Sequence, residues 1–298
     1  MVTKTKRIRE SSADALSWSV ERRLAFVEDR LFWLGEINRA ALVTRFGVSM
    51  SQASADISRY LEINPAGIDY DRSAKRYVAL PGFKPALQEP DARRFLGELR
   101  LVDAGLLDAG DTMLGFVPPF AAAPLPDRPI DPYVLRTVFQ AIRSAASVEA
   151  TYQSMSRPRP ATRTVEPHAL VFDGFRWHAR AFDRETGEFR DFVLGRILRV
   201  RLGKERASDP AEDVEWNETV ELEIAPHPRL SEAQTKAIAL DYGITKKSAR
   251  LPVRRALLYY ALKRLGLDHD PDSRPPNVQQ IVLLNRETVQ RLLSDATT

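Results

Sequence analysis

The feature that most constrains the fold of this chain is a proline-rich run at residues 116–132, FVPPFAAAPLPDRPIDP. Proline fixes the backbone angle φ and carries no amide hydrogen, so no continuous helix crosses this run. A shorter stretch of the same kind, LPGFKP, occupies residues 80–85. These stretches indicate that the chain, with 298 residues, folds as several parts with cores of their own.

A change of charge marks a third boundary. Residues 151–206 contain twelve Lys and Arg against seven Asp and Glu, whereas residues 208–224 contain seven acids and no base. The whole chain has a formal net charge of +4, which permits a polyanionic partner without requiring one. We predict four parts, at residues 1–80, 81–130, 131–207 and 208–298.

The first part predicts two successive helices. Apolar residues recur at steps of three and four from Leu16 to Leu34, and Gly35 is suited to end that helix. The segment EINRAALVTRF, residues 36–46, predicts a second helix, and Gly47 begins a tight turn after it. The inward side chains of the second helix are expected to be Ile37, Ala41, Leu42 and Phe46.

A third helix is predicted to begin at Ser49, which forms an S-x-x-Q capping box with Gln52. A short helix, a glycine turn and a capped helix are typical of a helix-turn-helix. The helical period places Ala53, Ile57, Tyr60 and Leu61 on the inward face. The opposite face suits the DNA major groove, because short side chains permit close approach while Gln and Arg pair with base edges. The predicted DNA-contacting residues are Ser49, Ser51, Gln52, Ala55, Ser58 and Arg59.

The run GIDYDRSAKRYVAL, residues 67–80, predicts a β-hairpin wing that offers Arg72, Lys75 and Arg76 to DNA phosphates. The basic tail from Lys4 to Arg9 is expected to hold phosphates as well. Three amphipathic helices and a hairpin also suit a plain interaction module, in which Gln52 only caps a helix. The order of turn, cap, small outward residues and basic wing favours DNA binding.

The central part predicts a small open β-barrel, because several short strands follow one another within about eighty residues. In the strand RWHARAF, alternation places three side chains on one face: Trp177, Ala179 and Ala181. The other face carries Arg176, His178, Arg180 and Phe182. We expect this cationic row to be either a solvated surface or a place where an anion binds.

Four motifs in this part resemble the WYL domain of bacterial transcriptional regulators, which is an Sm-like barrel of the SH3 type. They are Y-x-S at Tyr152, R-x-x-x-PH at Arg163, W-x-x-R-A-F at Trp177 and R-x-F-x-L-x-R-I at Arg190. Such regulators join an N-terminal winged helix-turn-helix, the WYL barrel and a C-terminal extension. Two positions depart from the pattern, since Trp177-His178-Ala179 replaces Trp-Tyr-Leu and Val193 replaces an arginine. Tryptophan before histidine, with an arginine two positions on, is similar to WYL repressors of the CapW and BREX-associated type, found beside anti-phage defence operons.

The resemblance implies a ligand sensor, and the side chains suit phosphate oxygens or a nucleic-acid fragment such as single-stranded DNA. Tyr152 and Phe192 are expected to stack on bases. The predicted ligand-binding residues are Tyr152, Ser154, Arg163, His168, His178, Arg180, Arg190 and Arg196. In the alternative interpretation, the arginines face water or pair with nearby acids: Asp183, Glu185, Asp191 and Glu166.

The last part predicts a mixed α+β extension. VELEI is a strand with Val220, Leu222 and Ile224 inward, and Ser231 with Gln234 forms a capping box. RRALLYYALKRLGL predicts a helix ended by Gly266, and VQQIVLLN predicts a further strand. Its wide apolar surface suits a dimer interface or burial within one subunit: Leu257, Leu258, Tyr260, Ala261 and Leu265.

Enzymatic and membrane functions are disfavoured. The chain has no cysteine, none of the common nucleotide-binding or hydrolase motifs, and four histidines without metal-ligand spacing. We expect no cofactor and no metal, although His168 and His178 near Ser154 leave a remote hydrolase alternative. No apolar run is long enough to span a membrane and the N-terminus lacks a signal peptide, so we expect a cytoplasmic protein.

We therefore predict an α+β multidomain regulator rather than an enzyme. It is expected to be a homodimeric repressor that binds an inverted-repeat operator of an anti-phage defence operon and is released when the WYL domain binds a nucleic-acid or other anionic ligand. Two alternatives stay open. One is a transcriptional activator of the DNA-damage-response type, and the other is an Sm-like nucleic-acid-binding module without an operator.

Overall fold

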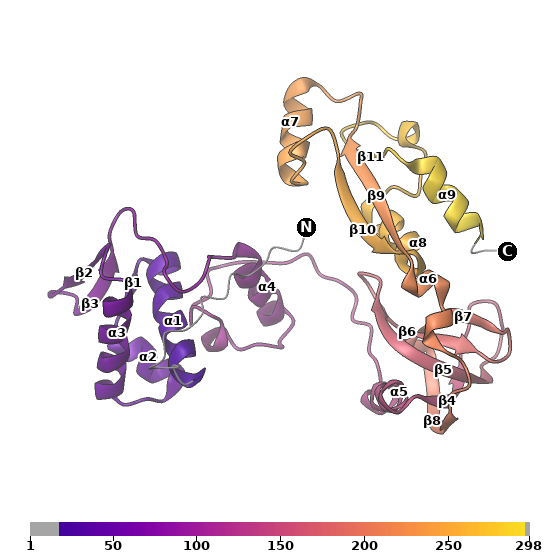
Figure 1. Cartoon of the computed structure of the whole chain (residues 1–298), viewed down its shortest axis with the longest axis horizontal. Coiled ribbons are helices and arrows are strands. Elements are labelled where there is room, and N and C mark those ends of the chain that lie inside the picture. Colours follow the sequence, from indigo (N-terminus) through magenta and orange to yellow (C-terminus); the bar gives the residue numbers. More distant parts are fainter. Residues whose placement is uncertain (1–17, 296–298) are drawn as a thin grey trace. The chain divides into compact units, whose positions relative to one another are not determined.

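The computed structural model describes residues 18–295, and the chain divides into two compact units, Met1–Leu125 and Pro126–Thr298 (Figure 1). No helix in the described residues is long and apolar enough to cross a membrane. The first unit contains helices and a three-stranded sheet of order β1-β3-β2. Its elements up to the hairpin are α1 (Trp18–Leu34), β1 (Glu36–Ile37), α2 (Arg39–Phe46), α3 (Met50–Ile63), β2 (Ile68–Asp71) and β3 (Arg76–Ala79).

The three helices and the hairpin enclose one apolar core. The predicted stripe of α1 is confirmed at Leu24, Val27 and Leu31, all of which are buried, whereas Leu16 lies outside the described residues. The predicted inward residues of α3 also reach this core, which contains Ala53, Ile57, Tyr60 and, at its edge, Leu61. These contacts fix the side of α3 that faces solvent.

The prediction that residues 36–46 form one helix is wrong at its start. Glu36 and Ile37 pair with β3 as a short strand, and α2 begins only after Asn38. The Asn38 side chain accepts a hydrogen bond from the Ala41 amide at 2.9 Å, so it satisfies a free helix amide and sets the boundary. Ile37 is nevertheless buried, and only its secondary structure differs from the prediction.

A buried carboxyl group on α1 anchors the chain that leaves the hairpin. Glu28, 1% exposed, accepts hydrogen bonds from the amides of Ala86, Leu87 and Gln88 at 2.5 to 2.9 Å. The Tyr60 hydroxyl donates to the same group at 2.8 Å. Three successive amides and a hydroxyl thus compensate for the desolvation of one acid. The segment at residues 86–88 is therefore part of the helix-turn-helix structure.

The connecting segment also packs onto these helices. It contains α4 (Ala92–Asp103) and the turn η1 (Ala109–Asp111). Glu98 on α4 accepts the Met113 amide at 2.6 Å, and Arg45 on α2 bonds the side chain and carbonyl of Asp111 at 2.6 and 2.9 Å. The segment is thus fixed to the α1–α2 pair at its far end as well as at Glu28.

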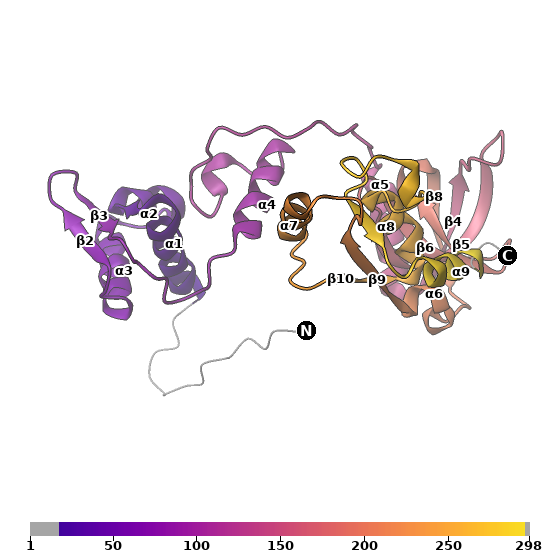
Figure 2. The same ribbon diagram turned by 90° about the horizontal axis from the view of Figure 1, so that it is seen from above.

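The second unit begins with α5 (Pro132–Ser144), which packs against β4, β5 and β8 of a five-stranded sheet (Figures 1 and 2). The sheet has the order β7-β6-β5-β4-β8 and is antiparallel throughout. No pairing of β7 with β8 closes it into a barrel within the described residues. Its strands are β4 (Ala146–Tyr152), β5 (Ala161–Phe172), β6 (Trp177–Asp183), β7 (Glu188–Val193) and β8 (Ile197–Glu205), with the turn η2 (Leu194–Arg196) before the last.

The sheet and α5 share a core of small and branched side chains, including Val138, Val148, Val165 and Ala181. One irregularity lies where β4 and β8 pair, with a register shift between Ala146 and Val148. Gly203 lies against Ser147 there so closely that an added Cβ would collide with Ser147 Oγ. Glycine at this position therefore permits the two backbones to approach.

The last part has the sheet order β10-β9-β11, covered by helices. The predicted strands are confirmed at β9 and β11, and Ser231 with Gln234 forms the predicted capping box. The predicted second helix is shorter than expected, because Arg254 ends a strand. The elements are η3 (Pro210–Glu212), α6 (Val214–Asn217), β9 (Thr219–Pro226), α7 (Glu232–Asp241), β10 (Ala249–Arg254), η4 (Arg255–Leu257), α8 (Leu258–Leu265), η5 (Pro271–Ser273), β11 (Ile281–Leu283) and α9 (Arg286–Asp295).

Much of the apolar surface of α8 is buried inside this part of the same chain. Leu258 and Leu262 are in its core with Leu222 and Ile281, and Ala261 and Leu265 pack against that core. These contacts support the alternative that the residues are covered within one subunit. Tyr259, by contrast, is 54% exposed.

Candidate nucleic-acid interface and ligand site

Ser49 caps the N-terminus of α3 as predicted, but the reciprocal half of the capping box is absent. Ser49 Oγ accepts the Gln52 amide at 3.1 Å. The Gln52 side chain does not return to the cap and instead donates from Nε2 to Asp56 Oδ1 at 3.0 Å. Asp56 is buried and also binds Arg23 of α1, with an Nε–Oδ2 distance of 2.6 Å. The amide of Gln52 is therefore oriented by an ion pair beneath α3.

The outward face of α3 is accessible over its whole length. Ser51, Gln52, Ala55 and Ser58 are exposed, and Arg59 is half-buried. Small side chains at three of these positions leave the helix backbone open to close approach from outside. The structure thus places together on one surface the residues of α3 that the sequence predicts to contact DNA.

The hairpin carries its cations unequally. Asp71 Oδ1 accepts the amides of Ser73 and Ala74 at 2.9 and 3.0 Å, which orders the tip, and Arg72 and Lys75 are exposed on it. Arg76 is half-buried and pairs with Glu36 of β1, so it is less available to phosphate than predicted. The predicted phosphate-binding tail from Lys4 to Arg9 lies outside the described residues.

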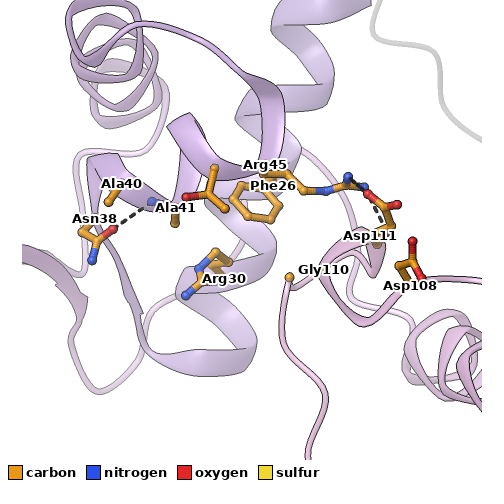
Figure 3. A pocket seen from close by; sticks show the side chains of 11 residues that line it. Phe26, Arg30, Asn38, Ala40, Ala41, Arg45, Asp108, Gly110 and Asp111 are labelled. Carbon is orange, nitrogen blue, oxygen red and sulfur yellow. Dashed lines mark hydrogen bonds and ion pairs between the residues drawn. The ribbon is translucent and has the colours of Figure 1, made fainter.

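A pocket of 420 Å³ lies beside these helices, between α1, α2 and the connecting segment (Figure 3). Phe26, Arg30 and Asn38 line one side of it, and Asp108 and Asp111 line the other. Both of its arginines are engaged by the connecting segment, since Arg30 donates to the Leu114 carbonyl at 2.5 Å and Arg45 binds Asp111. Burial lowers the pKa of the Arg30 guanidinium. The pocket therefore adjoins the attachment of the connecting segment to the DNA-binding helices.

In the second unit, β6 alternates as predicted, but its cationic face is open neither to solvent nor to an external anion, and Trp177 is not buried. Trp177 is 46% exposed, whereas His178 and Arg180 are 2% and 3% exposed. Ala179 and Ala181 do face the core as predicted. His178 and Arg180 are buried because Tyr260 of α8 covers His178, and Asp213 and Glu215 at the start of α6 bind Arg180.

The carboxylate of Asp213, the N-cap residue of α6, binds two of the predicted ligand residues. Asp213 accepts two hydrogen bonds from Arg180, at 2.8 Å each, and lies 2.9 Å from His168 Nε2. Glu215 binds Arg180 as well, at 2.8 Å. Asp213 is 1% exposed, and although burial raises the pKa of its carboxyl, the bonds from Arg180 and His168 hold that pKa well below its ordinary value. Arg180 and His168 are therefore fully engaged within the protein.

A second buried group contains His178. Its Nε2 lies 2.9 Å from Asp173, which also accepts the amides of Phe175 and Arg176 at 2.7 Å each. Burial raises the pKa of Asp173, but these hydrogen bonds outweigh burial and hold the pKa at about 2. Asp191 lies nearby and is bonded by Tyr260 and, at 3.5 Å, by Arg180; burial raises its pKa. These contacts join β6 to α8.

The remaining predicted ligand residues differ in accessibility. Arg163 pairs with Asp183 and, at 3.4 Å, with Glu185, so the alternative interpretation that arginines pair with nearby acids is confirmed for Arg163 and Arg180. Arg190 is exposed and pairs with Glu188 at 2.6 Å. Ser154 Oγ accepts the Arg157 amide at 3.1 Å in a half-exposed loop.

Tyr152 and Phe192 are in the core, 8% and 5% exposed, with their rings 5.2 Å apart. The structure therefore leaves neither ring accessible for the predicted stacking on a base. Arg196 is half-buried, and no side-chain partner of it is found in residues 18–295. The same holds for Arg159 and Arg199, which are exposed. No group of three or more metal-ligating side chains that suits a metal ion is found in the same range.

Sequence reasoning missed the roles of Asp213 and Glu215. The signal is present in the acid-rich stretch at residues 208–224, which by itself indicates only a boundary. A run of acids that follows a run of bases also indicates that the two can neutralise each other in the folded state. The structure shows that they do so at Arg180 and His168.

A winged helix with an accessible third helix, followed by a five-stranded sheet and a C-terminal α+β part, defines a class of modular transcription regulators. Three family models match in that order. They are the BrxR transcriptional regulator winged helix-turn-helix domain at residues 19–101, the WYL domain at residues 133–202, and the BrxR C-terminal dimerization domain at residues 219–289.

The chain belongs to the CapW family of WYL-domain regulators. It is 34% identical over 97% of both chains to the DNA-binding transcriptional repressor CapW of Stenotrophomonas maltophilia. CapW of Pseudomonas aeruginosa is 36% identical over 93% of this chain and 92% of its own. Both relatives are named as repressors rather than enzymes, which agrees with the predicted regulatory class. The solved structure of PafBC from Arthrobacter aurescens aligns with 88% of this chain and 45% of its own, at 18% identity and a TM-score of 0.29.

Proposed function

We propose that this protein is a homodimeric repressor that binds an inverted-repeat operator in the cytoplasm. Each subunit inserts α3 into the major groove, and the hairpin between β2 and β3 contacts the adjacent phosphates. Full-length similarity to DNA-binding repressors supports this function, as does the match to a dimerization domain. Two copies related by a twofold axis suit an operator with two equal halves.

The observation that carries the proposal is the exposed face of α3. Its cap and inward side chains fix the helix, while Ser51, Ala55 and Ser58 leave a shallow polar surface in solvent. A helix with this surface approaches base edges without steric hindrance from long apolar side chains. Arg72 and Lys75 at the hairpin tip supply positive charge for the phosphates beside the groove.

Duplex binding by an Ala55→Glu variant tests the proposal. Ala55 is exposed in the middle of α3, and glutamate there keeps the helix but brings a negative charge to the DNA. We expect roughly tenfold weaker binding to duplexes from the upstream region of its own gene, measured by fluorescence anisotropy. The matched control is Ala92→Glu at the exposed start of α4. Equal affinities of the two variants would count against α3 as the recognition helix.

We propose further that the WYL part, as an Sm-like barrel, senses an anionic nucleic-acid ligand such as single-stranded DNA. Among the predicted ligand residues, Ser154 and Arg196 are half-exposed, and Arg190 is exposed, although it pairs with Glu188. Arg159 and Arg199 add exposed guanidinium groups in the same part of the chain. A site built from these residues leaves the buried Arg180 and His168 as structural groups.

Release of the operator by a single-stranded oligonucleotide tests this sensor. We expect the oligonucleotide to displace the labelled duplex from the wild-type protein, and a double replacement, Arg196→Gln with Arg199→Gln, to weaken this effect severalfold. Arg201→Gln is the matched control, because Arg201 is exposed but already pairs with Glu149 at 2.6 Å. An unchanged response in the double variant would exclude this surface.

The regulated genes are proposed to form an anti-phage defence operon. A reporter gene behind the upstream promoter separates repression from activation, because deleting the regulator raises expression under a repressor and lowers it under an activator. We expect expression to rise. Wild-type duplex binding distinguishes both from an Sm-like module without an operator, which would bind single strands alone.

A further inference from the structure

A second cavity lies away from the proposed anion site, in the second unit. It is an open pocket with a volume of 610 Å³, lined by the end of β5 and the residue that follows it, the strand β10 and the helix α8. Its walls are largely apolar, with Phe172 from β5, Leu251 and Val253 from β10, and Ala261 and Leu265 from α8. A volume between 300 and 1,000 Å³ with walls of this kind is typical of sites for small organic molecules.

Arg264 supplies a solvent-exposed positive charge at the rim of this cavity. Its guanidinium lies across the β5–β6 turn so closely that a Cβ on Gly174 would be 2.9 Å from its Nη1. No hydrogen bond or ion pair of Arg264 is found within residues 18–295. Arg254, on the opposite wall, is already engaged, since it stacks on Trp216 at 4.4 Å and donates to the Trp216 carbonyl at 2.5 Å. Of the two arginines that line the cavity, Arg264 is therefore the one whose hydrogen-bond donors are available to a ligand.

The one carboxylate in the lining does not cancel this charge. Asp173 is 7% exposed, and its oxygens are occupied by His178, Arg176 and the amides of Phe175 and Arg176. A ligand in the cavity thus meets largely apolar walls, which include Tyr260, and one available guanidinium. Arg forms its strongest bonds with carboxylates, sulfonates and phosphates, because charge assistance roughly doubles a hydrogen bond.

We propose that this cavity binds a small amphipathic monoanion, with an aromatic or branched apolar body between β10 and α8 and its acidic group on Arg264. The site is separate from the nucleic-acid surface proposed above, because polynucleotides are polyanions that do not suit a largely apolar cavity with one available cation. Tyr260 lines the cavity and bonds Asp191, which contacts Arg180. The occupant therefore contacts Tyr260, which is linked through Asp191 to Arg180, the residue that binds Asp213 and Glu215.

Fluorescence titration of the full-length protein with anilinonaphthalene sulfonate tests this site. The probe has an aromatic body and one sulfonate, and Trp216 beside the cavity serves as an energy-transfer donor. We expect saturable binding of one probe per chain. The uncharged analogue phenylnaphthylamine, which lacks the sulfonate, is expected to bind roughly tenfold more weakly.

Two variants and a control locate the probe. Arg264→Gln is expected to weaken the sulfonate roughly tenfold while leaving the uncharged analogue unchanged. Ala261→Trp fills the cavity and is expected to weaken both probes. Lys263→Gln is the matched control, because Lys263 is an exposed cation on the same helix that lies over Tyr259 and does not line the cavity. Thermal melts verify that each variant is folded, and Arg264→Gln alone suffices if Ala261→Trp does not fold.

The proposal is overturned if Arg264→Gln and Lys263→Gln bind the sulfonate equally well. It is also overturned if the probe binds only when the protein is diluted enough to dissociate into monomers, because a second copy then covers the cavity in the dimer. Loss of sulfonate binding in Arg264→Gln, with duplex DNA binding retained, supports the site independently of the repressor function.

Discussion

Removing the carboxylate of Asp213 should destabilise the second unit more than any exposed substitution in the same stretch. Asp213→Ala leaves Arg180 and His168 buried without the acid that both contact, and removes the cap of α6, where Asp213 accepts the Trp216 amide at 3.1 Å. Removing one partner of a buried ion pair lowers the free energy of unfolding by about 3 to 5 kcal/mol. Because Arg180 still forms its ion pair with Glu215 at 2.8 Å in this variant, we expect a loss at the lower end of this range, about 3 kcal/mol.

Urea denaturation followed by tryptophan fluorescence and circular dichroism measures this loss. The two units can unfold separately, so the transition of the second unit is compared with that of the first, which serves as an internal reference. The matched variant is Glu212→Ala, an exposed acid one residue away, for which we expect a change within about 0.5 kcal/mol.

The contribution of Asp213 to the free energy of unfolding should decrease only toward low pH. The pKa of its carboxyl is held below the ordinary value in the folded state, so its contribution is complete above about pH 4 and is lost as pH falls through the folded pKa. The difference between wild type and Asp213→Ala is thus expected to stay constant from about pH 5 to 8 and to shrink under more acidic conditions. Equal urea midpoints for Asp213→Ala and Glu212→Ala at neutral pH would refute the reasoning.

Three further changes have expected outcomes. Asp29→Asn should stabilise the first unit above pH 6 by up to about 3 kcal/mol and have little effect near pH 4, because burial raises the pKa of this carboxyl from 3.8 to about 6; thermal melts at both pH values check this, and a gain at pH 4 alone would contradict it. Ser49→Ala should cost about 1 kcal/mol in urea unfolding of the first unit and Ser49→Gly only a few tenths, so equal losses would argue against the cap. Gly203→Ala should cost about 1 to 3 kcal/mol in thermal unfolding, because its Cβ would collide with Ser147 Oγ, and Ser147→Ala should restore part of that loss.

The helix-turn-helix could be predicted well from sequence because its signals are local. Ser49 begins a helix for a reason visible within four residues, and the period of Ala53, Ile57 and Tyr60 determines the buried side. The reciprocal half of the capping box is absent, because the Gln52 side chain donates to Asp56, which forms an ion pair with Arg23 on another helix. No local pattern contains that contact.

The ligand residues were harder to predict because alternation along a strand says which side chains share a face, not what covers that face. His178 and Arg180 were placed on one side correctly, but the cover comes from α6 and α8, thirty or more residues later in the chain. A cation that looks solvated in a single strand can therefore be neutralised by a distant acid. A count of acidic and basic residues over both the basic run at 151–206 and the acidic run at 208–224 indicates that such neutralisation is possible, but it does not identify which residues pair.

The anchoring of residues 86–88 on Glu28 decides where the DNA-binding fragment can be cut. A fragment ended at residue 80, just after the hairpin, removes three amides from a carboxyl that is 1% exposed in the whole protein. That acid then keeps the Tyr60 hydroxyl and otherwise draws water into the helix core. Truncation and fusion experiments with this domain therefore need to retain the chain at least through Gln88.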